Sequence, residues 1–201
     1  MKLYFAPGTR AMRPRWMLEE LGVPYEVQQL DLMKGEHKQP AYMKIHPLGV
    51  VPALDDNGFV MIESAAIVMH LADKFPEKGF APAPGTNERG EYYQWISYVM
   101  TEAEKPLVEI LMHTRFLPEA QRSPTVIATS SQRFKQVAVA LEERMKGREY
   151  VVGSKFSAAD VVVGGVLSLG AMLGQLGDYP ALQAYVQRLH QRPAAQKVFG
   201  H

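Results

Sequence analysis

A break between residues 76 and 87 limits the possible folds of this chain more than any other feature of its sequence. Neither a helical nor a strand pattern can continue through a segment so rich in proline and glycine. The five interrupting residues are Pro76, Gly79, Pro82, Pro84 and Gly85. Strand patterns occur only before the break, and only helical patterns follow it. We therefore expect two domains, residues 1–75 and 88–201, joined by a linker at 76–87.

The first domain begins with the pattern of a βαβ unit. Residues 2–5 and 25–30 are strand-like. Between them, apolar residues recur at helical spacing over residues 11–21 and stop at Gly22, a natural C-terminal residue for a helix. Because one helix connects the two strands, we expect the strands to be parallel neighbours.

A ββα unit follows within the same domain. Residues 50–54 and 59–62 are strand-like and flank Asp55-Asp56-Asn57-Gly58, which is a hairpin signature. Helical spacing then covers residues 64–75. A short helix is also expected near residues 41–45, before the two strands. The first domain is therefore predicted to be α/β, with a mixed four-stranded sheet.

The second domain is predicted to be entirely helical. Helical patterns cover residues 88–116, 122–146, 158–175 and 179–191. Ser157 and Asp160 form a capping box, in which the two residues satisfy free N–H groups at a helix start. Pro106 falls inside the first long helix, so we expect that helix to bend there.

The composition excludes several classes of function. The chain has 22 basic and 21 acidic side chains and a formal charge of +1, so no excess of positive charge favours nucleic acid or an anionic membrane as partner. It has no cysteine, which removes disulfides, thiolate metal sites and a protein-borne thiol nucleophile. Any sulfur chemistry therefore needs sulfur on the ligand. The histidines show no metal-ligand spacing, and we predict no metal site.

The chain carries no targeting pattern that we can identify. Its first residues turn at once into Pro7-Gly8 and lack the apolar run and cleavage site of a secretion signal. The longest apolar stretch, residues 161–176, contains four glycines and is shorter than the roughly 20 residues that a membrane span requires. We expect a cytoplasmic protein that does not interact with membranes.

Val51-Pro52 is the first candidate binding element. A proline in a strand cannot donate to the ladder, so this strand is an edge, contains a bulge, or carries a cis peptide bond. Each arrangement leaves the main chain of Val51 available to an extended, peptide-like ligand. The alternative is an edge proline without any binding role.

Glu63-Ser64 is the second candidate, at the start of a predicted helix. The free N–H groups of a helix start attract an anion, while the neighbouring carboxylate attracts a cation. Together they suit the carboxylate and ammonium of an α-amino acid. Alternatively, Ser64 only caps the helix and Glu63 is an ordinary acid at its first turn.

The third candidate is the loop Pro7-Gly8-Thr9-Arg10, between the first strand and the first helix. A hydroxyl from Thr9 can donate to a ligand thiolate and lower the thiol pKa from its usual value near 8.5. A shift of two pKa units requires about 2.7 kcal/mol, which a hydrogen bond to a charged group and a helix end can supply. Alternatively, Thr9 only caps the helix.

Five short motifs, taken in order, resemble those of one protein family. They are Pro7-Gly8-Thr9 with Arg13, Leu18-Glu19-Glu20-Leu21-Gly22, Val51-Pro52-Ala53-Leu54, Glu63-Ser64-Ala65-Ala66-Ile67 and Phe156-Ser157-Ala158-Ala159-Asp160. Their order and spacing resemble soluble, cytosolic glutathione S-transferases of the bacterial type, over nearly the whole chain. The resemblance implies a thioredoxin-like N-terminal domain followed by an all-helical domain, and a homodimer.

The resemblance also implies which residues contact glutathione. It implies a cis bond at Pro52, main-chain contacts from Val51 to the cysteinyl part, and recognition of the γ-glutamyl part by Glu63 and Ser64. His37 resembles a histidine that holds the glycyl carboxylate in some branches. The long helix is expected to contribute Tyr98, Thr101, Glu102 and Lys105 to the electrophile pocket.

Three residues are candidates for activating the thiol. Thr9 stands at the position of the serine in serine-type members, and Arg10 at the position of the cysteine in cysteine-type members. Tyr4 is the third candidate, because other branches use a tyrosine near the end of the first strand; the alternative is that Tyr4 belongs to the core. Arg13 either points into the site or pairs with an acid of its own helix.

The predicted function is that of a glutathione transferase with a detoxification role. Reduced glutathione loses its thiol proton, and the thiolate attacks a hydrophobic electrophile held between the domains. One alternative is a noncatalytic glutathione-binding or protein-interaction module on the same fold, because fold alone does not fix function. Glutathione-dependent isomerisation, dehalogenation and peroxide reduction are further alternatives that use the same thiol.

Overall fold

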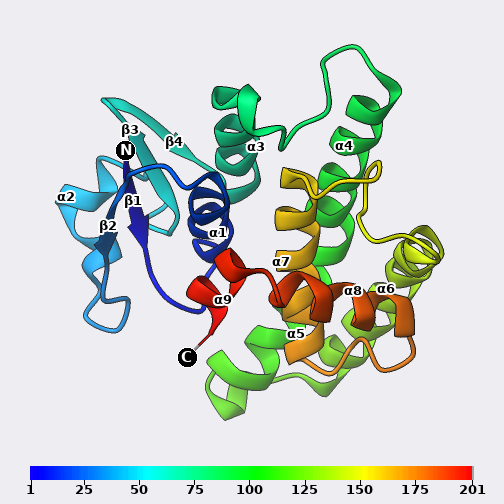
Figure 1. The fold of residues 1–201 in the computed structure, drawn as a ribbon. Coiled ribbons are helices and arrows are strands. Elements are labelled where there is room, and N and C mark those ends of the chain that lie inside the picture. The colour runs from blue at the N-terminus through cyan, green and yellow to red at the C-terminus, as the bar shows by residue number, and fades with distance from the viewer. Residues whose placement is uncertain (201) are drawn as a thin grey trace. The chain divides into compact units, whose positions relative to one another are not determined.

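The computed structural model describes residues 1–200 and divides into two compact units (Figure 1). The first unit comprises residues 1–81 together with 190–200, and the second comprises residues 82–189. The predicted division into residues 1–75, 76–87 and 88–201 remains a prediction. The structure differs from it in the C-terminal helix, which groups with the first unit.

The first unit contains a mixed sheet of four strands in the order β2-β1-β3-β4, as the sequence predicts. The elements are β1 (Lys2–Phe5), α1 (Met12–Leu21), β2 (Glu26–Gln29), η1 (Glu36–Lys38), α2 (Pro40–Met43), β3 (Ala53–Asp56), β4 (Phe59–Ile62), α3 (Ser64–Lys74), η2 (Pro76–Lys78) and α9 (Pro193–Phe199). β1 is parallel to β2, whereas β3 is antiparallel to both β1 and β4. Strands β1 and β4 therefore run in the same direction, and the helices that follow them begin at the same edge of the sheet.

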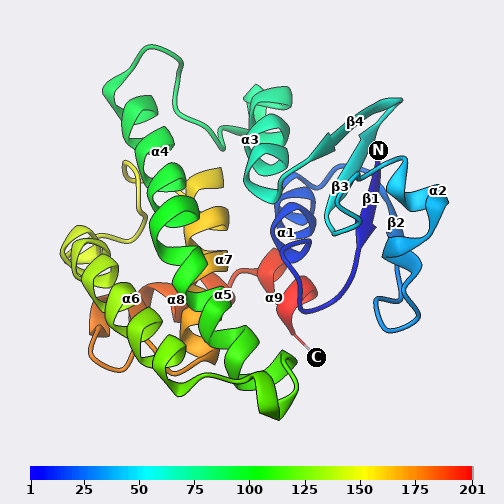
Figure 2. The same cartoon turned by 180° about the vertical axis from the view of Figure 1, so that it is seen from behind.

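Helices cover both faces of this sheet, with α1 and α3 on one face and α2 on the other (Figures 1 and 2). The alternation along β1 fits this arrangement, because Leu3 and Phe5 are buried while Tyr4 is partly exposed. α1 ends at Gly22, which adopts a left-handed conformation and donates its N–H to the carbonyl of Leu18. The predicted βαβ and ββα units are confirmed.

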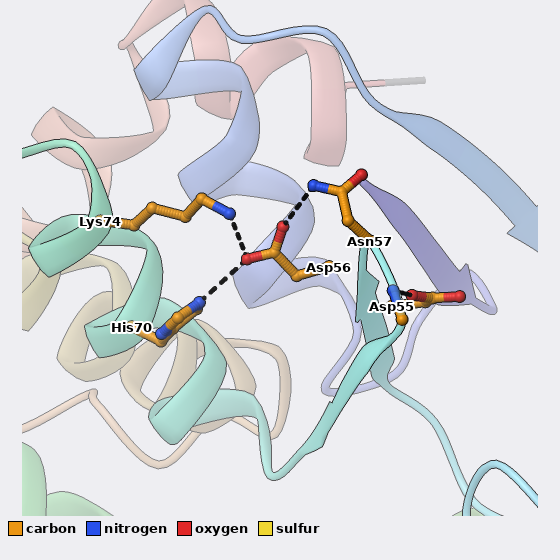
Figure 3. A network of polar contacts seen from close by, with 6 residues as sticks. Asp55, Asp56, Asn57, His70 and Lys74 are labelled. Atoms are coloured by element: carbon orange, nitrogen blue, oxygen red, sulfur yellow. Dashed lines mark hydrogen bonds and ion pairs between the residues drawn. The ribbon is translucent and has the colours of Figure 1, made fainter.

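The hairpin between β3 and β4 forms where its turn residues predict. Asn57 and Gly58 both have positive φ angles, 57° and 94°, as the central residues of a tight hairpin turn require. Asp56 anchors this hairpin to α3, since its carboxylate accepts hydrogen bonds from Lys74 Nζ and, at 3.2 Å, from His70 Nε2 (Figure 3). The hydrogen bond from Lys74 is the main cause that lowers the pKa of Asp56.

The C-terminal helix α9 packs against α1. The rings of Trp16 and Phe199 meet edge to face, with centroids 5.6 Å apart. Arg192 donates two hydrogen bonds to Glu20, at 2.6 and 2.8 Å, in the bidentate geometry that suits a guanidinium and a carboxylate. These contacts explain why α9 belongs to the first unit. Its helical sequence pattern alone suggested that it belongs to the second, helical unit.

The regular secondary structure of the second unit, residues 82–189, is entirely helical. Its elements are α4 (Asn87–Tyr98), η3 (Val99–Ala103), α5 (Glu104–Leu111), η4 (Met112–Phe116), η5 (Glu119–Gln121), α6 (Pro124–Met145), α7 (Ala158–Met172) and α8 (Pro180–His190), whose last residue belongs to the first unit. The core includes the fully buried side chains of Tyr92, Phe134 and Tyr185. Among residues 1–200, no helix has both the length and the apolar character that crossing a membrane requires.

Two local predictions in this unit concern the start of α7 and the helix around Pro106. The capping box forms at the start of α7, where Asp160 accepts a hydrogen bond of 2.8 Å from the N–H of Ser157. Near Pro106, the segment Val99–Ala103 immediately before α5 is π-helical, whereas the bend expected at Pro106 stays a prediction. A proline lacks the N–H that an α-helix would use, and π-helical hydrogen bonding upstream accommodates that loss.

Candidate active site

The loop between β1 and α1 holds Thr9 in a local hydrogen-bond pattern. Its hydroxyl donates to the carbonyl of Ala6 at 2.6 Å and accepts from the N–H of Ala11 at 3.2 Å. A hydroxyl has only one hydrogen to donate. The Thr9 hydroxyl must therefore turn away from Ala6 before it can donate to a ligand thiolate.

The two other candidates for thiol activation lie in different surroundings. Arg10 is exposed in the same loop as Thr9. Tyr4 points to the α2 face of the sheet, where its ring centroid lies 5.5 Å from that of Tyr42. Tyr4 is thus only partly buried and packs against α2. The structure brings Thr9 and Arg10 together at the start of α1 and leaves Tyr4 on the α2 face of its strand.

The segment before β3 forms a second loop at the same edge of the sheet. The Val51–Pro52 peptide bond is cis, as the resemblance implies. β3 begins at Ala53, which pairs with Tyr4, so the main chain of Val51 lies outside the ladder. The Tyr42 hydroxyl donates to the carbonyl of Val50 at 2.7 Å, which fixes the course of the loop. Burial raises the pKa of Tyr42, and the neighbouring Tyr4 adds to the effect.

Glu63 and Ser64 form the junction between β4 and α3. Glu63 is exposed and has φ 71° and ψ 109°, an unusual conformation for a residue other than glycine. Such a conformation costs on the order of 1–3 kcal/mol and is found preferentially at functional sites. Ser64 is 2% exposed and begins the helix. An exposed carboxylate and a helix start are therefore adjacent, as the sequence predicts.

Arg13 connects the two helix starts. It is buried, and its Nη1 donates a hydrogen bond of 3.2 Å to the hydroxyl of Ser64. Arg13 thus reaches the start of α3, and the choice between the two alternatives for Arg13 stays a prediction. The sequence contains a signal for this contact, because α1 and α3 follow strands of the same direction and must begin close to each other.

His37 lies beside the loop that leads to Pro52. A Cβ atom on Gly49 would come within 2.6 Å of the His37 carbonyl oxygen, so η1 and this loop are in close contact. The His37 Nδ1 is buried without a hydrogen-bond partner among the described residues. Lys38, which the sequence analysis did not consider, donates from Nζ to the carbonyl of Leu48 at 2.9 Å. A histidine and a lysine therefore lie next to each other at this end of the loop.

His46 is a further residue that the sequence analysis missed. It is 2% exposed, and its ring stacks on Tyr42 with centroids 6.4 Å apart. Burial lowers the pKa of His46, while the negative charge of Glu63 acts in the opposite direction. A neutral imidazole is thus buried close to the candidate γ-glutamyl site. Its position in the sequence, directly before Pro47, gives no sign of this burial.

The predicted electrophile residues lie in the second unit. Tyr98, Thr101 and Glu102 line a groove of about 560 Å³ between the α4–η3 segment and α6, while Lys105 is exposed outside it. Glu102 forms an ion pair with Arg133 across this groove. The lining is mostly polar, whereas pockets for apolar ligands are mostly hydrophobic. The assignment of these four residues to an electrophile pocket remains a prediction.

No metal centre is formed within the described part of the chain, residues 1–200. No group of three or more histidine, cysteine, aspartate or glutamate side chains there is arranged to hold a metal ion.

Comparisons with known proteins agree with this architecture. The family model described as "Glutathione S-transferase, N-terminal domain" matches residues 1–73, and the one described as "Glutathione S-transferase, C-terminal domain" matches residues 92–193. Glutathione S-transferase 1 of Dianthus caryophyllus is 30% identical, with 98% of this chain and 92% of the relative covered. Glutathione S-transferase GstA of Escherichia coli is 28% identical, with 98% and 96% covered.

A solved structure is similar over the same extent. The structure of a sphingomonad glutathione S-transferase complexed with glutathione has a TM-score of 0.85 at 31% identity, and 98% of this chain and 96% of that chain are covered. The fold is thus a thioredoxin-like domain followed by a helical domain. The chain belongs to the glutathione S-transferase family and is a glutathione transferase enzyme. The predicted family, fold class and transferase function are confirmed.

Proposed function

We propose that this chain binds reduced glutathione at the sheet edge where α1 and α3 begin, and transfers its sulfur to a hydrophobic electrophile. The observation that carries the proposal is the junction at Glu63 and Ser64. The exposed carboxylate of Glu63 suits the ammonium of the γ-glutamyl part, and the start of α3 suits its carboxylate. The strained φ angle of Glu63, 71°, supports a role in ligand binding.

The remaining contacts follow the extended shape of the tripeptide. The main chain of Val51, next to Pro52, pairs with the cysteinyl part, because it lies outside the ladder. His37 binds the glycyl carboxylate through a ring nitrogen, and its Nδ1 is buried and unpartnered among the described residues. In this proposal, each carboxylate of the ligand pairs with a positive or donor group of the chain.

The reaction needs a thiolate and a leaving group. The thiol of bound glutathione gives its proton to solvent, and the thiolate forms a bond to an electrophilic carbon while the leaving group departs with the bonding electron pair. Thr9 is our first choice for the group that stabilises the thiolate, with Arg10 and Tyr4 as the alternatives. A shift of two pKa units requires about 2.7 kcal/mol.

The electrophile is proposed to contact Tyr98, Thr101, Glu102 and Lys105 of the long helix. Steady-state conjugation of glutathione to chlorodinitrobenzene tests this assignment and the activating residue together. We expect Thr9→Ala to lower kcat/KM about tenfold or more, and Tyr98→Ala to raise KM for the electrophile. Unchanged turnover in Thr9→Ala would exclude Thr9 as the group that stabilises the thiolate. The same assay on Arg10→Ala and Tyr4→Phe would then decide between these two alternatives.

We further propose that the protein is a cytoplasmic homodimer with the predicted domain limits, and that it binds neither nucleic acid nor membranes. Exposed apolar side chains on the β3–β4 hairpin support association, since Phe59 is 59% exposed and Val60 is 41% exposed. Sedimentation equilibrium should give twice the 22.5 kDa mass of the chain. We expect Phe59→Glu to shift the protein towards the monomer, and a monomeric wild type would refute this part of the proposal.

A further inference from the structure

Two side chains of the segment η1–α2 hold the loop that leads into β3, residues 46–52. Lys38 donates from Nζ to the carbonyl of Leu48 at 2.9 Å, and the Tyr42 hydroxyl donates to the carbonyl of Val50 at 2.7 Å. Both hydrogen bonds direct carbonyl oxygens of the loop towards η1 and α2. This side of the loop is therefore occupied by the chain itself.

The two donors differ in how firmly they are held. Lys38 is exposed, whereas Tyr42 is 4% exposed and its ring is packed on two sides. The ring centroid of Tyr42 lies 5.5 Å from that of Tyr4 and 6.4 Å from that of His46. Because the hydroxyl oxygen is rigidly attached to the ring, close packing of the ring also fixes the position of the oxygen. The hydrogen bond to Val50 thus comes from a donor with a fixed position.

The Val50 carbonyl belongs to the same peptide group as the N–H of Val51. A peptide group is planar, and this one is trans, because Val51–Pro52 is the one cis peptide bond among residues 1–200. In a trans peptide group the C=O and the N–H point in opposite directions. By holding the Val50 oxygen, the Tyr42 hydroxyl therefore also fixes the direction of the Val51 N–H, which points away from Tyr42.

The N–H of Val51 has no hydrogen-bond partner within residues 1–200. Val51 is 9% exposed, and a main-chain donor in a buried residue normally has an acceptor, because leaving it without one is costly. We therefore expect the acceptor to come from a ligand. The amide carbonyl of an extended, peptide-like ligand is an acceptor of the right kind.

We propose that Tyr42 is a positioning residue for glutathione: through the Val50–Val51 peptide group, its hydroxyl directs the Val51 N–H towards the cysteinyl carbonyl of the ligand. This inference rests on the proposed function, which places the cysteinyl part along Val51. Tyr42 itself lies behind the loop and does not contact the ligand. Its hydroxyl increases affinity by preorganisation, since a peptide group that is already oriented loses less conformational freedom when the ligand binds.

Tyr42→Phe tests this role, because it removes the hydroxyl and keeps the ring that packs against Tyr4 and His46. The control is Tyr179→Phe in the second unit, where a tyrosine hydroxyl also donates to a main-chain carbonyl, that of Lys135, at 3.1 Å. Tyr179 is 8% exposed, so the two substitutions are matched in burial as well as in chemistry. Chemical denaturation checks that both variants fold.

Isothermal titration calorimetry should show that Tyr42→Phe raises the Kd for glutathione about fivefold, and that Tyr179→Phe leaves it within about twofold. In conjugation assays, KM for glutathione should rise about fivefold in Tyr42→Phe alone, while kcat at saturating glutathione stays within about twofold in both variants. A loss of fold stability alone would not separate KM from kcat in this way.

A pair of ligands then locates the effect at the cysteinyl carbonyl. γ-Glutamylcysteinamide has this carbonyl, and γ-glutamylcysteamine lacks it. The wild type should bind the first about fivefold more tightly than the second, whereas Tyr42→Phe should bind the two within about twofold of each other.

Two results would overturn this inference alone. One is an equal preference for γ-glutamylcysteinamide in the wild type and in Tyr42→Phe. The other is equal glutathione affinity of Tyr42→Phe and Tyr179→Phe. A wild type that binds no glutathione would overturn the proposed function together with this inference, so the two failures are distinguishable.

Discussion

Two helices begin at the same edge of the sheet and use their hydroxyl residues differently. At α1, the hydroxyl of Thr9 is engaged within its own loop, with Ala6 and Ala11. At α3, the hydroxyl of Ser64 accepts a hydrogen bond from Arg13 of the other helix, and the preceding Glu63 is exposed in a strained conformation.

We infer from this difference that the start of α3 recognises glutathione and that the start of α1 activates its thiol. At the start of α3, Arg13 holds the Ser64 hydroxyl and the backbone of Glu63 has a strained conformation, which are properties expected of a recognition element. At the start of α1, the Thr9 hydroxyl must break its hydrogen bond to the carbonyl of Ala6 before it can donate to a thiolate. We therefore expect substitutions at α3 to act mainly on glutathione affinity, and substitutions at Thr9 mainly on the thiol pKa.

The largest effect is expected for Glu63→Gln. This change keeps the shape of the side chain and removes the charge that we propose faces the ligand ammonium. Loss of a hydrogen bond to a charged group costs about 1.5–3 kcal/mol, so the Kd for glutathione should rise about 10- to 150-fold. Isothermal titration calorimetry measures this change, with the exposed Glu77→Gln as a matched control. Equal affinities for the two variants would contradict the role of Glu63.

A smaller effect is expected for Ser64→Ala. The substitution removes a hydroxyl at the start of α3 and takes away an acceptor from Arg13. We expect a loss of about 0.5–1.5 kcal/mol, the contribution of a typical hydrogen bond, because the free N–H groups of the helix start remain for the ligand carboxylate, so the Kd should rise about 2- to 12-fold. Calorimetry with Ser154→Ala as control checks the result. An affinity loss as large as that of Glu63→Gln would mean that the hydroxyl, and not the carboxylate, is the main contact.

Asp56→Asn should lower the stability of the fold and leave glutathione affinity unchanged. The ion pair of Asp56 with Lys74 lies at the end of α3 that is far from Ser64. We expect the free energy of unfolding to fall by about 1 kcal/mol at pH 7, since Lys74 is one-third exposed to solvent. Chemical denaturation measures this loss. A change in glutathione affinity would show that the two ends of α3 are coupled.

The effect of Asp56→Asn on the free energy of unfolding depends on pH, and its sign follows from the pKa of Asp56. The pKa of Asp56 is lower in the folded chain than its ordinary value of 3.8. The carboxylate therefore adds stability above pH 3.8, and this contribution is lost as the pH falls through the folded-state pKa. The stability difference between wild type and Asp56→Asn should accordingly shrink as the pH falls through the folded-state pKa of Asp56. A difference that grows in acid would contradict this assignment.

The smallest effect is expected for Thr9→Ser, which keeps the hydroxyl and removes one methyl group. Because the same hydrogen bonds remain available, kcat/KM for conjugation should stay within about twofold of wild type. A loss of more than tenfold would show that the methyl group positions the hydroxyl, and that the threonine differs functionally from the serine of serine-type members.

The sequence predicted those elements whose structure depends on local residues. Gly22, the hairpin at Asn57 and Gly58, and the capping box at Ser157 each satisfy a requirement set by their immediate neighbours, and all three occur as predicted. Asn57 and Gly58, for instance, tolerate positive φ angles without help from tertiary contacts.

The features that the sequence did not predict depend on contacts between distant segments. The position of α9 is set by Arg192 and Glu20, which lie far apart in the sequence. The contact of Arg13 with Ser64 likewise requires both helix starts to be known. The burial of His46 depends on Tyr42 and on the path of the following loop. Periodicity within one element carries no information on such contacts.

The central claim, that this chain binds glutathione and holds its sulfur as a thiolate, is tested most directly by the ultraviolet absorbance of the thiolate during a pH titration of the complex. The wild-type complex should develop the thiolate band at lower pH than free glutathione, whose thiol has a pKa near 8.5. Thr9→Ala should move that transition upwards by about one pKa unit. A wild-type complex that titrates at the same pH as free glutathione would contradict the claim.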